Sequence, residues 1–279
     1  MMAKLAFITG ATSGIGLATA RMLASNGYEL ALAARSGDKL EALKKELTDL
    51  WEEKPEKLSI SENDPLEIRE EILDGPKRPH ISTYVLDVRD RDAVKQVTKR
   101  CMDELGVPDV LINDAGLARG LEPYGDTDEE DIIQMIDTNI KGLFLVTHAF
   151  LPAMVKRNSG HIINLGSTAG LYAYAGAAVY CASKAAVKTF SDGIRIDVIA
   201  SNVKVTTIQP GIVETPFSEV RFHGDSKRAK AVYEGVEALK PEDIASAIVY
   251  VLSQPRRVQV SDMVIMANQQ ATGFMVHKK

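Results

Sequence analysis

Short apolar runs alternate with amphipathic stretches along the whole chain. The runs suit strands buried on both faces of a parallel sheet, and the stretches between them carry apolar residues at helical spacing. The seven candidate strands are Leu5–Thr9, Glu29–Ala34, Ser82–Leu86, Val110–Asn113, His161–Gly166, Lys204–Gln209 and Met263–Met266. This alternation predicts an α/β fold over residues 1–279, a single Rossmann-type domain in which helices cover both faces of a seven-stranded parallel sheet.

Two longer segments are expected to form the longest helices. Glu130–Lys156 and Ala178–Ala200 contain spaced apolar residues and few helix breakers. Pro152 lies near the end of the first segment and lacks a backbone N–H, so we expect it to disturb the last turns of that helix.

One region departs from the alternation. From Trp51 to Pro79 the chain is charged, rich in proline and without an apolar run long enough for a strand. We interpret it as a surface insertion at about 51–80. A short helix is expected between Asp64 and Gly75, because Asp64 followed by Pro65 is typical of an N-cap and a first helical residue. A solvated loop is the favoured interpretation, and a partner-binding segment is the alternative.

Composition narrows the class of protein. The 279 residues are 45% hydrophobic and 25% charged, with a net charge of -5, and nucleic-acid binding needs clustered basic residues instead. Cys101 and Cys181 are far apart and lack metal-ligand spacing, so no metal site is expected. The N-terminal run Leu5–Ile8 is unlike a signal peptide, and no run of about 18 apolar residues occurs, so we expect neither a secretory leader nor a spanning helix. We expect a soluble, cytoplasmic protein that acts on a small molecule, without nucleic-acid or membrane partners.

A glycine-rich loop joins the first candidate strand to a helical segment. Glycines let the backbone approach a pyrophosphate, whose charge the N–H groups at the start of the next helix stabilise. The loop residues predicted to bind a dinucleotide are Gly10, Thr12, Ser13, Gly14, Ile15 and Gly16. A tight connection without a ligand is the alternative interpretation.

The end of the second strand indicates which dinucleotide is bound. An NAD site usually places an acidic residue there to bind the ribose hydroxyls, whereas this chain has Arg35 followed by Ser36. A guanidinium pairs well with the 2′-phosphate of NADP, so NADP is the predicted cofactor. A solvated surface arginine is the alternative.

Three side chains form a candidate catalytic group. Tyr180 and Lys184 lie four residues apart at the start of a predicted helix, and Ser167 follows a strand at the edge where open α/β sheets bind ligands. An ammonium beside the phenol should lower the pKa of Tyr180, which would then exchange a proton with an alcohol or carbonyl oxygen held by Ser167. A Tyr and a Lys at this spacing also occur on ordinary amphipathic helices, so the prediction depends on the combination of motifs.

The ordered set of motifs resembles the short-chain dehydrogenases/reductases over nearly the whole chain. It comprises Thr9–Gly16, Asn113-Asp114-Ala115-Gly116, Asn139, Ser167, Tyr180 with Lys184, and Pro210-Gly211 followed by Thr215. The resemblance implies that Asn139 bends a helix and carries a water in a proton relay to Lys184. It implies cofactor contacts from Asp87, Val88, Asn113, Ala115, Gly116, Tyr180, Lys184, Pro210, Gly211, Val213 and Thr215. It also implies a homodimer or homotetramer.

Two features depart from the family pattern. Asp114 stands where the family usually has a second asparagine, and we expect it to perturb the sheet-stabilising role of that turn while leaving catalysis intact. The segment from Trp51 to Pro79 is longer than the family pattern leads us to expect.

A narrower resemblance concerns the substrate. Met135–Asn139, Gly160–Gly170 and Val220–Asp225 resemble the dehydrogenases of 3-hydroxy acids such as serine and allo-threonine. A substrate carboxylate needs a cation, and Arg221, in a substrate-covering segment at about 212–236, is the first candidate. Arg119 is the second, and a surface charge or a structural ion pair is the alternative for each. Leu117, Thr168, Tyr174 and Phe217 are further candidates for the pocket wall.

Two other functions remain open at this point. The same fold and residues could reduce neutral aldehydes, ketones or steroid-like alcohols. A protein that binds NADP without turnover is an alternative from another class, although a mere binder has no use for a general acid.

Overall fold

Seven parallel strands form one sheet in the computed structural model, which describes residues 3–52 and 79–279. The strands are β1 (Leu5–Thr9), β2 (Glu29–Ala34), β3 (Ile81–Val85), β4 (Val110–Asn113), β5 (Gly160–Leu165), β6 (Val203–Pro210) and β7 (Asp262–Ile265). Their order across the sheet is β3-β2-β1-β4-β5-β6-β7, and every pair is parallel. The predicted fold class is confirmed. The predicted insertion and its short helix lie almost wholly outside the described residues.

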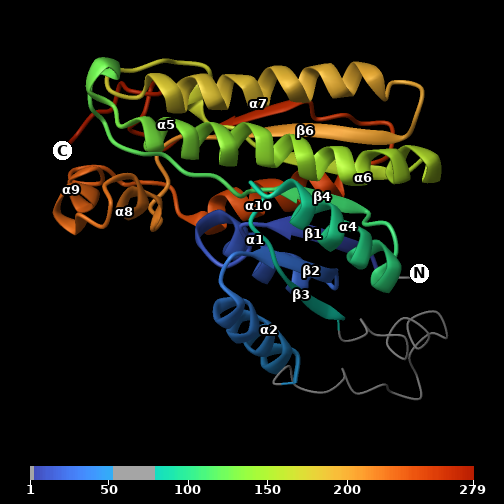
Figure 1. Cartoon of the computed structure of the whole chain (residues 1–279). Helices are drawn as coiled ribbons and strands as arrows, with labels where there is room; N and C mark the ends of the chain where they lie inside the picture. Colours follow the sequence, from blue (N-terminus) through green and yellow to red (C-terminus); the bar gives the residue numbers. More distant parts are fainter. Residues whose placement is uncertain (1–2, 53–78) are drawn as a thin grey trace, which may run out of the picture.

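Helices cover both faces of the sheet (Figure 1). One layer contains α1 (Gly14–Ser25), α2 (Gly37–Glu52) and α10 (Pro241–Ser253), and the other contains α4 (Arg91–Leu105), α6 (Leu143–Arg157) and α7 (Ala178–Asp197). Three shorter helices, α5 (Glu129–Ile136), α8 (Phe217–Arg221) and α9 (Ser226–Ala231), lie toward the end of the molecule where the chain terminates (Figure 1). No helix among the described residues is long and apolar enough to span a membrane.

The strands have apolar side chains on both faces because each face packs against a helix layer. In β1, Ala6 and Ile8 join the cluster with α1, α2 and α10, whereas Leu5 and Phe7 join the cluster with α4, α6 and α7. All five residues of β1 are buried. This two-sided burial explains why the strands were recognisable as continuous apolar runs.

The first long helix expected from the sequence is divided into three parts. A six-residue π-helical segment, Asp137–Gly142, separates α5 from α6 and contains Asn139, at the bend that the family resemblance implied. The expectation for Pro152 was wrong, because α6 continues through it to Arg157 and ends where Asn158 adopts a left-handed conformation (φ 56°).

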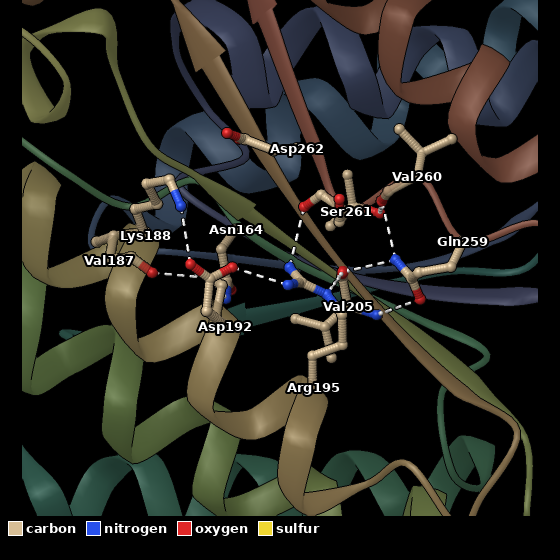
Figure 2. A network of polar contacts seen from close by, with 12 residues as sticks. Asn164, Val187, Lys188, Asp192, Arg195, Val205, Gln259, Val260, Ser261 and Asp262 are labelled. Carbon is tan, nitrogen blue, oxygen red and sulfur yellow. Dashed lines mark hydrogen bonds and ion pairs between the residues drawn. The ribbon is translucent and has the colours of Figure 1, made fainter.

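Helix α7 is anchored to the far edge of the sheet. Arg195 donates to the Val205 carbonyl of β6 and to the Ser261 carbonyl just before β7, and it pairs with Asp192 on its own helix (Figure 2). Asp192 also binds Lys188. These contacts fix the position of the helix that carries Tyr180 and Lys184.

The strand order reverses between β1 and β4. From β1 the chain builds outward to β2 and β3, then returns to the other side of β1 to add β4 and the remaining strands. The connections that leave β1 and β4 at their carboxyl ends therefore diverge, and a crevice opens between them. The glycine-rich loop and Asp114 both lie at this point.

Candidate active site

One cavity of about 630 Å³ runs along the carboxyl edge of the sheet. Its walls include most of the predicted site residues: Gly10, Thr12, Ser13, Gly14, Ile15, Arg35, Ser36, Asp87, Val88, Ala115, Gly116, Ser167, Tyr180, Lys184, Pro210, Gly211, Val213, Thr215 and Arg221. The suggested wall residues Leu117, Thr168, Tyr174 and Phe217 also line it. Segments far apart in the sequence therefore meet around a single space.

Three predicted residues lie outside the cavity walls. Gly16 packs against the carbonyl of Gly10, and a Cβ at Gly16 would lie only 2.5 Å from that oxygen. The Asn113 amide donates to Thr147 and Asn164 at 2.9 Å each, inside the layer between sheet and helices. Asn139 is buried and does not line the cavity either, so all three residues lie behind the residues that form its walls.

The glycine loop has the geometry that a pyrophosphate requires. Gly10 (φ 70°) and Gly14 (φ 52°) occupy left-handed conformations, and helix α1 begins directly at Gly14. The loop thus exposes backbone at a helix N-terminus, where an anion is stabilised. A Cβ at Gly14 would lie 3.3 Å from the Thr215 methyl group, which places the Pro210–Thr215 segment against the loop.

The cavity wall at the end of β2 is cationic. Arg35 is exposed at the end of β2 and lines the cavity together with Ser36 and Lys39. Lys39 was not singled out from the sequence, although its spacing of four residues from Arg35 was a usable signal. Arg35 and Lys39 would hold a 2′-phosphate, and the glycine loop would hold the pyrophosphate. The residues present therefore fit NADP.

Asp87 occupies the wall near these cationic residues. Arg89 grips its carboxylate through Nε and Nη2, at 3.0 and 2.7 Å, and this hydrogen bonding lowers the pKa of Asp87. The more distant charge of Arg35 acts in the same direction. The carboxylate is therefore held in its ionised form beside Val88.

Ser167 and the first two turns of α7 bring the catalytic candidates together. Tyr180 and Lys184 are both buried, at 8% and 6% exposure, and Ser167 begins the turn after β5. The Ser167 hydroxyl accepts the Ala169 N–H at 3.1 Å and donates to the Pro210 carbonyl at 3.4 Å, and it lies close enough to the Tyr180 phenol to influence the pKa of that group. Lys184 Nζ donates to the Leu165 carbonyl at 2.7 Å, which directs it into the crevice at the end of β5.

The structure corrects the expected pKa of Tyr180. Burial raises the pKa of Tyr180 to about 12. The charge of Arg221 is the largest influence that lowers this pKa, and Ser167 lowers it less. Lys184 is not among the main influences on the pKa of Tyr180, and its ammonium donates to the Leu165 carbonyl. Burial also lowers the pKa of Lys184 to about 8, against the attraction of Asp114.

Asn139, in the π-helical segment, uses its side chain to join two other parts of the molecule. Its amide group accepts the Leu117 N–H at 2.9 Å and donates to the Leu117 carbonyl at 2.8 Å, and it also donates to Ser183 on α7 at 3.0 Å. Both amide hydrogens are therefore engaged in holding the turn after β4 against α7. The proposed water relay to Lys184 would have to use the backbone of this segment.

Asp114 affects a different part of the molecule from the one expected. Its backbone N–H still donates to Thr9, so the turn remains tied to β1. Its carboxylate accepts the Gly16 N–H below the glycine loop and attracts Lys184. Burial raises the pKa of Asp114 to about 7. The substitution thus links the cofactor loop electrostatically to the catalytic lysine.

We predict that Asp114→Asn removes part of the pH dependence of stability. A carboxyl whose folded pKa lies above its unfolded value of 3.8 binds more protons in the folded state, so stability falls as pH rises from about 4 to about 7. At about 1.4 kcal/mol per pKa unit, the wild type should lose on the order of 2 kcal/mol between pH 5 and pH 8 through this group. Asparagine keeps the acceptor for Gly16 and abolishes the loss.

Urea unfolding of both proteins at pH 5 and pH 8 measures this difference. Without the carboxylate the pKa of Lys184 should fall further below 8, so the alkaline limb of an activity profile that depends on Lys184 should move to lower pH. An unchanged difference in unfolding free energy between the two pH values would rule out a buried, titrating Asp114.

The two candidate arginines have different surroundings. Arg119 donates to Gln134 at 3.1 Å and to the Val220 carbonyl, and it lies 3.7 Å from the Asp131 carboxylate. Arg119 is thus a structural residue that joins α5 to the α8 segment. Arg221 instead lies over the Tyr180 ring, with its guanidinium carbon 5.1 Å from the ring centroid.

Arg221 is a cation without an acidic partner among the described residues. Its Nη2 donates to the Tyr174 hydroxyl at 3.0 Å, its guanidinium also lies 5.5 Å from the Phe217 ring, and its Nε is buried with no partner. A half-buried guanidinium that has no counter-ion and whose enclosed Nε lacks an acceptor favours an anionic ligand beside Tyr180.

The glycine loop lies where the strand order reverses, and it shares one cavity with the buried residues Ser167, Tyr180 and Lys184. This combination defines a dinucleotide-dependent oxidoreductase. Residues 4–61 and 54–225 match the short chain dehydrogenase family. The chain belongs to that family, as the motif set indicated.

Individual relatives cover the whole chain. It is 40% identical over 273 residues to the NADP-dependent 3-hydroxy acid dehydrogenase YdfG of Salmonella typhi. The aligned residues cover 97% of this chain and 98% of that protein. It is 38% identical over 271 residues to sulfoacetaldehyde reductase 2 of Chromohalobacter salexigens, with 97% and 96% covered. The solved closed form of serine dehydrogenase complexed with NADP⁺ superposes with a TM-score of 0.82 at 38% identity, covering 99% of this chain and 100% of that one.

Proposed function

We propose that this protein is an NADP-dependent dehydrogenase of short 3-hydroxy acids, of the serine, allo-threonine and 3-hydroxypropionate type. The observation that carries the proposal is Arg221, an uncompensated guanidinium beside the Tyr180 ring in the cavity wall. The relatives named for NADP and for 3-hydroxy acids support it, as does the structural similarity to serine dehydrogenase.

The chain's own residues would divide the work as follows. Arg221 binds the carboxylate of the substrate, and Ser167 holds the oxygen at the reacting carbon. Tyr180 takes the hydroxyl proton in oxidation and returns it in reduction, and the bound nicotinamide supplies the hydride chemistry. Lys184 and the segment Pro210–Thr215 would position the cofactor, and Arg35 with Lys39 would select NADP over NAD.

An anionic substrate with a sulfonate is the second candidate. The relative from Chromohalobacter salexigens is named a sulfoacetaldehyde reductase, and a sulfonate would meet Arg221 as a carboxylate does. A neutral carbonyl substrate is disfavoured because it would leave the guanidinium without a counter-charge. A homodimer or homotetramer and a cytoplasmic location remain predictions of the family resemblance.

Absorbance of the reduced nicotinamide tests the proposal. Purified protein is offered NADP or NAD with L-serine, D-serine, allo-threonine, 3-hydroxypropionate, 3-hydroxybutyrate, 2-hydroxyethanesulfonate and neutral alcohols. We expect turnover of hydroxy acids with NADP and at least about tenfold lower kcat/KM with NAD, a difference of about 1.4 kcal/mol. Turnover of neutral alcohols alone would contradict the proposal, and turnover of the sulfonate alone would replace it with the second candidate.

A further inference from the structure

The C-terminal segment contributes one side chain to the cavity that no sequence motif indicated. Gln270 follows β7, is 5% exposed and lines the same cavity as Tyr180 and Arg221. Its Oε1 accepts the Ile212 N–H at 2.9 Å. Because that backbone group can only donate, the oxygen end of the amide is identified and Nε2 is the end left over.

The packing around this amide is tight. A Cβ at Gly211 would lie 2.0 Å from Gln270 Oε1, so the glycine of the Pro210-Gly211 pair makes room for the side chain. Further along the same segment, a Cβ at Gly273 would lie 3.2 Å from the Thr168 carbonyl, next to Ser167. The segment Gln270–Gly273 therefore packs against two turns of the cavity wall, the one at Pro210-Gly211 and the one after Ser167.

Gln270 Nε2 is buried and has no hydrogen-bond partner. In the described part of the chain, six buried side-chain atoms lack a partner: four oxygens and two N–H donors. The two N–H donors are Arg221 Nε and Gln270 Nε2, and both residues line the same cavity, whereas the two threonine hydroxyls in this set belong to residues outside its walls. A buried donor without an acceptor is unfavourable, and a pocket that holds two of them suits an oxygen-rich ligand.

We infer that Gln270 is a substrate-binding residue whose Nε2 donates to an oxygen of the substrate's anionic group, alongside Arg221. The inference rests on the proposed function. A neutral amide adds a directional hydrogen bond without a second positive charge, so Arg221 attracts the anion and Gln270 orients it. The C-terminal segment then takes part in substrate specificity.

Two variants and a matched control test this role. Gln270→Glu keeps an acceptor for Ile212 but replaces the donor with a negative charge, and Gln270→Met removes the donor without adding charge. Asn268→Asp adds the same charge at an exposed neighbour in the same segment. Each protein is assayed with 3-hydroxypropionate and with 1,3-propanediol, its neutral analogue, and the Kd for NADPH is measured by fluorescence.

We expect Gln270→Glu to lower kcat/KM for 3-hydroxypropionate at least about 100-fold, mainly through KM, and Gln270→Met about tenfold. Both variants should change kcat/KM for the diol and the Kd for NADPH less than threefold, as should Asn268→Asp for every quantity. Equal losses for acid and diol, or weakened NADPH binding, would assign the amide to the cofactor or the loop and overturn the inference. The same loss in Asn268→Asp would also overturn it.

The two proposals fail in different ways. If the wild type turns over the diol and not the acid, the proposed function fails, and the inference with it. If the wild type turns over the acid and both Gln270 variants match it, only the role of Gln270 fails.

Discussion

Replacing Tyr180 with phenylalanine is expected to lower kcat about 10³-fold while leaving NADPH binding within threefold of the wild type. General acid–base groups contribute about 10²–10⁴-fold, and Tyr180 is the buried residue beside Ser167 that we propose exchanges the proton. Phenylalanine keeps the ring that packs against Phe217 at 5.7 Å, so the wall of the cavity should be preserved. Steady-state kinetics and NADPH fluorescence titration separate the two quantities.

The pKa of Tyr180 predicts the direction in which the rates of oxidation and reduction change with pH. Burial raises the pKa of Tyr180 to about 12, so the neutral phenol that reduction needs is the main form at pH 6–9. Oxidation needs the phenolate, so kcat/KM for oxidation should rise between pH 7 and pH 10, while reduction should be insensitive to this group below pH 9. The positive charge of a bound oxidised nicotinamide favours the phenolate and moves the rise to lower pH without changing its direction.

Tyr250→Phe is the matched control, because Tyr250 is an exposed tyrosine on α10 outside the cavity. Its kcat should stay within twofold of the wild type. A Tyr180→Phe enzyme that keeps more than a tenth of the wild-type kcat would remove the phenol from the mechanism.

Arg221→Met is expected to lower kcat/KM for 3-hydroxy acids by about 10²–10³-fold. Removing one partner of a desolvated charge pair costs about 2–5 kcal/mol, and methionine keeps the apolar stem that packs near Tyr180 and Phe217. The loss should appear mainly in KM, because the carboxylate is bound in the ground state as well as in the transition state. A neutral alcohol of the same length should lose far less.

The variant has a second measurable effect. The charge of Arg221 is the largest influence that lowers the pKa of Tyr180 against burial, so its removal should raise that pKa further. The rise of the oxidation rate should then move to higher pH for acids and neutral alcohols alike. Arg221→Lys keeps a charge but loses the planar group over the ring, and we expect an intermediate KM with a smaller pH displacement. Equal losses of kcat/KM for acids and neutral alcohols would contradict a carboxylate-binding role.

Much of the fold followed from the sequence because its signals are local. The inner strands are buried on both faces and the connections contain helices, so apolar runs identified all seven strands, three with the bounds that the structure gives and four with each bound shifted by one residue. The glycine loop, Ser167 and the Tyr180–Lys184 pair were recognisable because backbone conformation and helical spacing constrain the residue types at those positions.

The expectations that needed correction depended on neighbours distant in the sequence. A lysine four residues from Tyr180 suggested a lowered pKa, but the dominant influences are burial and Arg221, which α8 brings over the ring. Asp114 was assigned to the sheet, whereas its carboxylate meets the Gly16 N–H on another loop. Pro152 was expected to disturb α6, yet the helix continues past it.

The sequence by itself determined the α/β class and located the glycine-rich loop and the candidate catalytic residues, because these depend on periodicity and on residues close together in the chain. Only the tertiary structure shows that the surroundings of Arg119 and Arg221 differ: Arg119 is hydrogen-bonded to Gln134 and lies beside Asp131, whereas Arg221 has no acidic partner among the described residues. It alone placed Gln270 in the cavity. Hydrogen-bond partners and desolvation are properties of three-dimensional surroundings, and sequence spacing does not specify them.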